Sequence, residues 1–397
     1  MNAIRNPFAP GAGSQPPELA GRDRLREQVR IAIARLRIGR HAKSVLMVGL
    51  RGVGKTVLLD RMRADAEEAG VFTLRAETPE NRSLPALLAP QLRMALLRIS
   101  TVANAKHLAD HALRALAGFV GALKIKFNDI EVALDLEPEK GLADNGDLET
   151  DLATLFEQVG RAAQAAGTAV VLFLDEIQYI EEAQFAALIS ALHRCAQANL
   201  PVTVVGAGLP QLRGLAGAAK SYAERLFDFP MIGPLLPDDA RLAIVKPAHD
   251  EQVEFTAEAV DSILEKTHGY PYFLQEWGKH SWDVASQSPI NLHDVTLASI
   301  QAVADLDQSF FRVRFDRLTP TEKKYLRAMA ELGPGPHRSG DIAAIVGRAV
   351  STLAPVRQSL IVKGMLWSPN HGDTAFTVPL FDEFMKRIMP GLNWKTD

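Results

Sequence analysis

The sequence predicts an α/β protein whose central sheet is mostly parallel and covered by helices on both faces. Short continuous apolar runs, such as SVLMVG at 44–49 and TAVVLFLDE at 168–176, alternate along the chain with helical patterns, as in sheets of this kind. From about residue 234 the pattern is helical throughout, and from 319 a run of helices leads into an alternating hairpin. We therefore expect an α/β core followed by two smaller modules.

The composition is that of an ordinary globular protein. The chain has 397 residues, 47 % of them hydrophobic and 23 % charged, and this length predicts two or three domains. The net charge of −3 excludes a generally basic nucleic-acid binder, although residues 319–397 hold ten Lys and Arg against seven Asp and Glu. The single cysteine, Cys195, excludes a disulfide framework.

Neither a membrane span nor a secretion signal is predicted. No apolar run approaches the ~20 residues of a spanning helix, and the N-terminal stretch MNAIRNPFAPGAGSQPPELAGR lacks the apolar segment of a signal peptide. We expect a cytoplasmic protein with no membrane partner. Residues 1–17, rich in Pro and Gly, are expected to form a flexible arm.

The core is expected to span residues 18–233. Helical patterns cover 22–38, 55–69, 84–120, about 149–165 and 182–197, and strand patterns cover 44–49, 71–77, 168–176, 201–208 and 227–233. Residues 123–136 alternate about Asn128-Asp129 and predict a hairpin, followed by a polar loop to 148. The stretch of about 84–148 therefore forms an insertion in the core. The residues of 123–148 indicate no chemistry, and a surface for a partner is one use for them.

A glycine-rich loop follows the first strand. The string GLRGVGKT at 49–56 fits G-x-x-x-x-G-K-[ST] at every fixed position. A chance glycine turn is the alternative, but the apolar strand before the loop and the helix after it are the context of a phosphate loop. Lys55 is expected to reach the β- and γ-phosphates and Thr56 to bind Mg²⁺. The candidate nucleotide-binding residues here are Gly49, Leu50, Arg51, Gly52, Val53, Gly54, Lys55, Thr56 and Val57.

Two adjacent carboxylates, Asp175 and Glu176, end a later apolar strand. Neighbouring negative charges repel each other, so such a pair indicates that a cation binds nearby or that one of the two carboxylates has a catalytic role. Together with the phosphate loop, the pair predicts that Asp175 helps to hold Mg²⁺ and that Glu176 activates the water that attacks the γ-phosphate. A helix-capping Asp beside a solvated Glu is the alternative. The chain has no N-K-x-D string for guanine, so ATP is favoured over GTP.

These residues resemble those of the AAA+ ATPases, in the branch near the origin-recognition initiators and the STAND signalling ATPases. ELAGRDRL at 18–25 looks like the stretch that passes the adenine, with Leu19, Gly21 and Arg22, and KTHGYPYFLQ at 266–275 looks like the lid turn, with Gly269 and Pro271. The resemblance implies a helical lid over 234–318. In ERLFDF at 224–229 it implies that Arg225 acts on the γ-phosphate of a neighbouring subunit; a surface salt bridge is the alternative.

The sequence departs from this family at two positions. The fourth core strand, in VTVVGAGLPQL at 202–212, has Thr203 early instead of a polar residue at its end, and the lid turn lacks the arginine found in many members. Both departures favour slow hydrolysis.

Residues 319–397 show the element order of a winged helix-turn-helix domain: helices at 319–332, 339–347 and 351–364, a two-stranded wing at 365–378 and a closing helix. The module resembles the domain that ends origin-recognition-type initiators, whose third helix enters the major groove. Protein contact is the alternative use. The candidate DNA-contacting residues are Arg348, Ser351, Thr352, Arg357 and Lys363.

The favoured interpretation is an ATP-dependent switch with a P-loop core, a helical lid and a winged-helix module that binds duplex DNA. Its catalytic residues would be Lys55, Glu176 and Arg225, the last in a homo-oligomer. The first alternative is an initiator-like or transposition-helper ATPase stimulated by DNA. The second is a STAND-like scaffold that hydrolyses ATP slowly or not at all and recruits an unidentified protein partner. A small-molecule kinase would leave the lid and the C-terminal module unexplained.

Overall fold

The computed structural model describes residues 1–11, 13–14, 16–78, 83–123, 137–391 and 393–395. The chain divides into two compact units. One comprises Arg22–Val48 and Lys55–Met231, and the other comprises Met1–Gly21, Gly49–Gly54 and Ile232–Asp397. None of the helices in the described ranges is long and apolar enough to span a membrane.

The first unit is built around a parallel sheet, as predicted. Its strands are β1 (Ser44–Gly49), β2 (Phe72–Glu77), β3 (Val170–Asp175), β4 (Val202–Gly208) and β5 (Phe227–Asp228), arranged in the order β2-β3-β4-β1-β5. All residues of β1, β3 and β4 are buried, because helices cover both faces of the sheet. The ends of β1 and β3, where the sequence predicts phosphate and metal sites, therefore lie at the same edge, with β4 between them.

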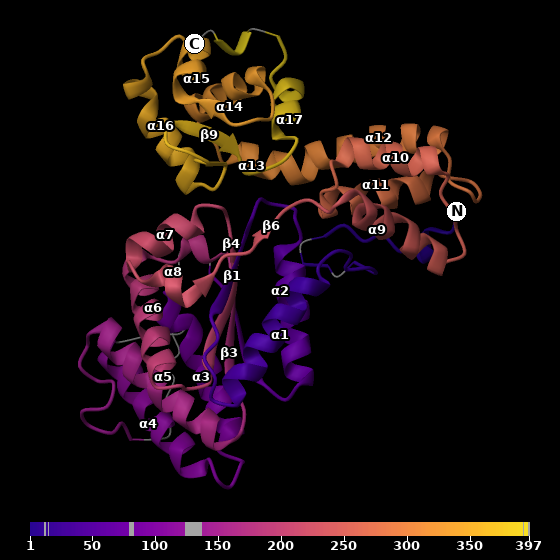
Figure 1. Ribbon diagram of the computed structural model, residues 1–397. Helices are drawn as coiled ribbons and strands as arrows, with labels where there is room; N and C mark the ends of the chain where they lie inside the picture. Colours follow the sequence, from indigo (N-terminus) through magenta and orange to yellow (C-terminus); the bar gives the residue numbers. More distant parts are fainter. Residues whose placement is uncertain (12, 15, 79–82, 124–136, 392, 396–397) are drawn as a thin grey trace. The chain divides into compact units, whose positions relative to one another are not determined.

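Helices lie on the two faces of this sheet (Figure 1). Helices α1 (Asp23–Arg37) and α2 (Lys55–Glu68) lie on one face, and α3 (Leu84–Ile99), α5 (Leu148–Ala165) and α6 (Glu182–Gln197) lie on the other, with α4 (Lys106–Ala122) packed against α5. Cys195, on α6, is fully buried, and burial raises the pKa of its thiol to about 12. The predicted hairpin of 123–136 lies, beyond residue 123, outside the described residues.

Two predicted elements of the core are divided in the structure. The helical stretch 84–120 forms α3 and α4, which are separated by turns between Ser100 and Ala105. The predicted strand at 227–233 forms two short strands, β5 and β6 (Met231–Ile232), which both pair with β1. Pro230 lies between them and has no N–H to donate to a ladder. Helices α7 (Leu212–Ala219) and α8 (Ala223–Leu226) precede these strands.

The second unit contains the helical module expected from residue 234. It consists of α9 (Pro237–Asp250), α10 (Ala257–Thr267), α11 (Pro271–Val284), α12 (Leu292–Leu306), a π-helix at Asp307–Phe311 and α13 (Arg312–Asp316). Residues from these helices and from the C-terminal module form one continuous hydrophobic cluster. The two modules are therefore packed together and not merely joined by a linker.

The first residues of the chain pack on α11, although we expected residues 1–17 to form a flexible arm. Phe8 is 3 % exposed and lies against Gly278, where an added Cβ would come within 2.5 Å of the ring. Trp282 Nε1 donates to the Asn2 carbonyl at 3.0 Å. Burial of the Phe8 ring stabilises this contact by about 2 kcal/mol. The Pro and Gly content of the segment gave no indication of this contact.

The C-terminal module has the winged-helix architecture. Its helices are α14 (Pro320–Leu332), α15 (Ser339–Val346), α16 (Val350–Val362) and α17 (Phe381–Ile388), and its antiparallel sheet has the order β7-β9-β8, from His337–Arg338, Asp373–Phe376 and Leu366–Trp367. Thr319 is the N-cap of α14 and forms a capping box in which Glu322 Oε2 accepts from Thr319 N at 2.7 Å. Helix α16 occupies the position of a recognition helix, and β8 and β9 form the wing.

Candidate functional site

The glycines of the phosphate loop adopt backbone conformations that other residues rarely adopt. Gly52 and Gly54 have φ angles of 80° and 85°, in the left-handed region that favours glycine. At Gly49 an added Cβ would lie 2.2 Å from the Ile232 carbonyl oxygen, so a larger residue would displace the backbone. The predicted role of these glycines, a close backbone approach to phosphate, is thus matched by the local conformation of the loop.

The lid residue predicted to face the nucleotide lies beside this loop. Pro271 is the first residue of α11, and its Cβ lies 3.9 Å from the Cβ that an alanine at position 54 would carry. The backbone N–H of Tyr272 donates to the Gly52 carbonyl at 3.2 Å. The Gly269–Pro271 turn therefore belongs to the same unit as Gly49–Gly54 and touches the loop directly.

In the other unit, α2 begins immediately after the loop and presents its first residues to the sheet edge. Lys55, the first residue of α2, is 8 % exposed. Thr56 follows it, and its side chain forms a hydrogen bond with the Asp175 carboxylate at the end of β3. The N-terminal end of α2 also carries the partial positive charge of the helix dipole. The Thr56 hydroxyl and the Asp175 carboxylate are thus close together, and Lys55 directly precedes Thr56 on α2.

Asp175 is a buried carboxylate with mixed surroundings. It is 3 % exposed, and this burial raises its pKa, as does the neighbouring Glu176 carboxylate. The hydrogen bond from Thr56, the backbone N–H of Glu176 at 2.9 Å from Oδ1, and Arg75, with Nη2 3.7 Å from Oδ2, act in the opposite direction. These contacts therefore do not fully offset the free-energy cost of burying the ionised Asp175 carboxylate, and a bound cation would offset the remainder.

The oxygens of Thr56 and Asp175 fit Mg²⁺, which is usually held by one or two protein ligands together with substrate phosphates and waters. Within the described residues, no group of three or more His, Cys, Asp and Glu side chains could hold a metal by itself. The site thus suits a metal that arrives with a nucleotide.

Glu176 is fixed by a set of polar contacts that the sequence did not reveal. Its backbone is left-handed, with φ 53°, an unfavourable conformation for a residue with a side chain and one that often marks functional positions. Its carbonyl accepts from Thr78 Oγ1 at 2.7 Å. Its carboxylate accepts from Gln178 Nε2, and Gln178 Oε1 in turn accepts from the backbone N–H of Leu209 at 3.0 Å, directly after β4.

Gln178 therefore connects the candidate base to the end of the fourth strand, where the sequence lacks a polar residue. Thr203, the polar residue within that strand, is buried, and its hydroxyl hydrogen-bonds Ser44 Oγ at 2.8 Å inside the sheet. The position of Gln178, two residues after Glu176, was the one signal available in the sequence.

The remaining nucleotide-site candidates are placed as follows. Leu19 and Val57 are half-buried, and Arg22, just before α1, is also half-buried. Arg225, on the short helix α8, is exposed, and no ion pair of its side chain occurs among the described residues. The surface salt bridge that was the alternative for Arg225 is thus not formed there.

The five candidate DNA contacts fall into two groups. Arg348, Ser351 and Thr352 are exposed around the start of α16. Arg357 instead donates through Nε to Thr374 Oγ1 at 2.7 Å and through Nη2 to Ser368 Oγ and the Asp373 carbonyl. Lys363 Nζ lies 2.7 Å from Oε2 of Glu322, which is buried. Arg357 and Lys363 therefore connect elements of the module itself.

A parallel sheet with β4 between β1 and β3, a glycine loop after β1 and an acidic pair after β3 together define the P-loop ATPase class. Within that class, residues 18–205 match the family model of the AAA ATPase domain. Residues 308–385 match a domain of unknown function, DUF8462. No curated protein sequence matches the chain.

Two solved structures share the fold over nearly their whole length. The Walker-type ATPase PABY2304 of Pyrococcus abyssi is similar with a TM-score of 0.59 and 15 % identity, covering 96 % of this chain and 99 % of that one. The Orc1 protein of Aeropyrum pernix, solved in complex with DNA, is similar with a TM-score of 0.50 and 14 % identity, covering 96 % of each chain. At these identities the likeness shows the fold alone.

Proposed function

We propose that the chain is an Mg²⁺-dependent ATPase of the AAA type that acts as a slow nucleotide-dependent switch, and that its winged-helix module binds duplex DNA. The observation that carries the first part is the hydrogen bond between Thr56, at the start of α2, and the buried Asp175, at the end of β3. It brings together the two protein oxygens that the metal of a phosphate-loop enzyme requires.

Each residue of the site then has a defined task. The glycine loop and Lys55 bind the phosphates, and Lys55 stabilises the charge of the transferring γ-phosphoryl group. Thr56 and Asp175 hold Mg²⁺, which neutralises phosphate charge when bound. Glu176, held by Gln178, takes a proton from the attacking water. Exposed Arg225 is available to a neighbouring copy of the chain, as a homo-oligomer would require.

The contacts of the second unit support a coupling between nucleotide and winged helix. Tyr272, whose N–H binds the phosphate loop, stacks on Phe310 of the π-helix with ring centroids 4.7 Å apart. The next residue, Phe311, stacks on Phe384 of α17 at 5.2 Å. A turn of the lid is thereby linked through packed rings to the core of the winged helix, so a nucleotide that moves the turn would move the module.

The proposal of DNA binding is supported by Arg348, Ser351 and Thr352, which are exposed around the start of α16. It is also supported by the similar Orc1 protein, whose structure was solved in complex with DNA. The alternative is a STAND-like scaffold, in which ATP binds, hydrolysis is slow or absent, and the winged helix recruits a protein. It is favoured by the absence of a polar side chain at the end of β4 in the sequence.

Steady-state ATP turnover of Glu176→Gln and wild type, each with and without duplex DNA at low salt, tests the proposal. We expect Mg²⁺-dependent turnover that rises with DNA and falls at least 100-fold in Glu176→Gln. Glu182→Gln, an exposed position on α6, is the matched control and should behave as wild type. Turnover that is insensitive to Glu176→Gln would refute the catalytic assignment. Slow turnover that DNA does not change would favour the scaffold.

A further inference from the structure

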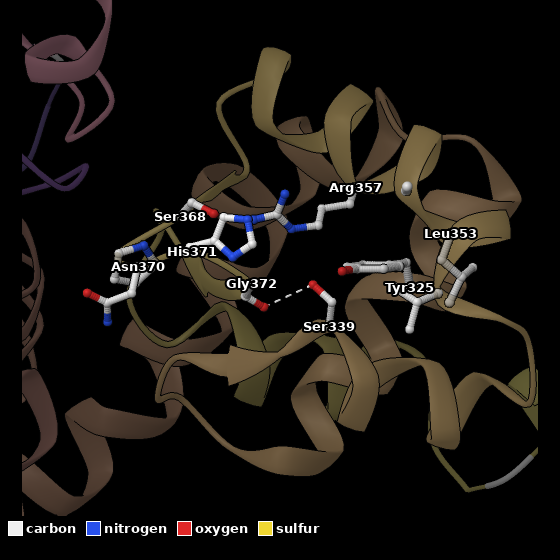
Figure 2. A pocket seen from close by; sticks show the side chains of 11 residues that line it. Tyr325, Ser339, Leu353, Arg357, Ser368, Asn370, His371 and Gly372 are labelled. Atoms are coloured by element: carbon white, nitrogen blue, oxygen red, sulfur yellow. Dashed lines mark hydrogen bonds between the residues drawn. The ribbon is translucent and has the colours of Figure 1, made fainter. Parts of the chain in front are cut away.

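The winged-helix module contains a cavity between its recognition helix and its wing. The cavity has a volume of about 570 Å³, which is within the range of small-molecule sites. Its lining comes from α14, the start of α15, one face of α16 and the tip of the wing: Tyr325, Ser339, Val350, Leu353, Ala354, Arg357 and residues 368–372. Figure 2 shows the side chains of Tyr325, Ser339, Arg357 and His371 converging on this space.

The cavity is lined by an arginine and by no acidic side chain. Arg357 and His371 supply nitrogen donors, and Ser339, Ser368 and Asn370 supply neutral polar groups. The carboxylate of the neighbouring wing residue Asp373 is not part of the lining and accepts from Asn370 Nδ2 at 3.1 Å. The cavity therefore favours an anion over a cation.

Arg357 is held in a fixed orientation by the protein. Its Nε and Nη2 are used by Thr374, Ser368 and the Asp373 carbonyl. Within the described part of the chain, its Nη1 has no partner. Two nitrogens of the guanidinium are therefore immobilised, and the N–H donors of the third can bind a ligand. Such a group is preorganised for an oxyanion, because the side chain loses little further entropy on binding.

The remaining walls of the cavity are apolar. Tyr325 is 2 % exposed, and its hydroxyl is buried beside the Thr374 side chain. The Tyr325 ring, Leu353, Ala354 and Pro369 give the same cavity apolar walls.

We propose that this cavity binds a small organic anion, a carboxylate or phosphate carried on an apolar body. The anion is held by Arg357, and the body packs on Leu353 and Ala354. A DNA phosphate has the same charge. However, a phosphodiester carries no apolar body to cover the walls formed by Leu353, Ala354 and Pro369, so the structure favours a free small molecule.

The fluorescent aromatic sulfonate 8-anilinonaphthalene-1-sulfonate is a suitable probe, titrated into the full chain. Ala354→Trp fills the cavity from an exposed position of α16, and Gln358→Trp, exposed on the same helix but outside the lining, is its matched control. We expect probe binding to be at least tenfold weaker in Ala354→Trp and unchanged in Gln358→Trp.

Probe binding that is absent in wild type, or equal in wild type and Ala354→Trp, would overturn the proposal. Duplex DNA is titrated into the same proteins. If Ala354→Trp abolishes duplex binding and leaves probe binding intact, the cavity serves the DNA backbone, which also overturns the proposal.

Discussion

Gln178 binds the candidate catalytic base Glu176: its Nε2 donates to the Glu176 carboxylate, while its Oε1 accepts from the N–H of Leu209 at 3.0 Å. The base is thereby tied to the end of β4. We expect Gln178→Ala to lower ATP turnover about tenfold with little change in KM, since an unrestrained carboxylate spends less time in the attacking geometry. Gln197→Ala, at an exposed position of α6, is the control. Undiminished turnover in Gln178→Ala would show that the contact does not position the base.

Lys55→Ala should abolish nucleotide binding. Lys55 is the buried first residue of α2, and the ammonium group of a lysine at this position of a phosphate loop binds the β- and γ-phosphates. Anisotropy of a fluorescent ATP analogue should show affinity at least 100-fold weaker. Lys106→Ala, at the exposed first residue of α4, should retain wild-type affinity. Equal affinity in both variants would remove Lys55 from the site.

Asp175→Asn should abolish Mg²⁺-dependent turnover and yet stabilise the metal-free protein. Burial raises the pKa of Asp175, so the ionised carboxylate is less favourable in the folded than in the unfolded chain, and stability is lost as pH rises through this pKa. The asparagine removes that loss at neutral pH, and the difference should vanish below the ordinary pKa of Asp. Thermal unfolding at pH 7 and pH 3.5, with and without Mg²⁺–ADP, measures both effects. A lower Tm for metal-free Asp175→Asn at pH 7 would contradict the prediction.

Acid should weaken the winged-helix module through Glu322. Burial alone raises the pKa of Glu322, but hydrogen bonds from Lys363, the Thr319 N–H and Ser359 outweigh it and hold the pKa at about 2, below the ordinary 4.5. The stability that this lowered pKa contributes, on the order of 3 kcal/mol, is complete above pH 4.5 and is lost as pH falls from 4.5 towards 2.

Glu322→Gln keeps the capping geometry but cannot titrate. Chemical unfolding monitored by tryptophan fluorescence should therefore show a shallower loss of stability below pH 4.5 for the variant than for wild type. Parallel pH profiles would indicate that Glu322 titrates normally.

Arg348→Ala should weaken duplex binding several-fold and reduce the slope of log affinity against log salt by about one. Arg348 is exposed at the start of α16, where a recognition helix contacts phosphate or base edges. Lys386→Ala, an exposed residue of α17, is the charge-matched control. An equal loss in both variants would point to general electrostatic attraction and not to α16.

The core could be predicted from local signals. The strand bounds of β1 and the start of α2 follow from an apolar run and a glycine loop, which need only neighbouring residues to be recognised. Asp175 and Glu176 were predicted for the same reason. Pro230 was also a local signal that the strand predicted at 227–233 is divided, because proline has no N–H to donate to a strand ladder. We predicted one longer strand because that was the simpler interpretation.

Long-range partners could not be predicted. Gln178 acquires its role by contacting Leu209, which is 31 residues away. Lys363 bonds to Glu322, 41 residues earlier, and Arg357 bonds to residues of the wing. From the sequence alone we predicted that Lys363 and Arg357 contact DNA, because a sequence shows their positive charges but not the residues that they bind in the folded protein. The packing of the whole fold decides which charged side chains are left to bind another molecule.

The buried Cys195 has a practical consequence. Because only the thiolate reacts readily with maleimides, a fully buried thiol whose pKa is raised to about 12 stays unlabelled in the native protein. A cysteine introduced at an exposed site on α12 and another on α17 could each carry a dye without removal of the natural one. Energy transfer between two such dyes would then report on rearrangements within a single molecule as it processes nucleotide.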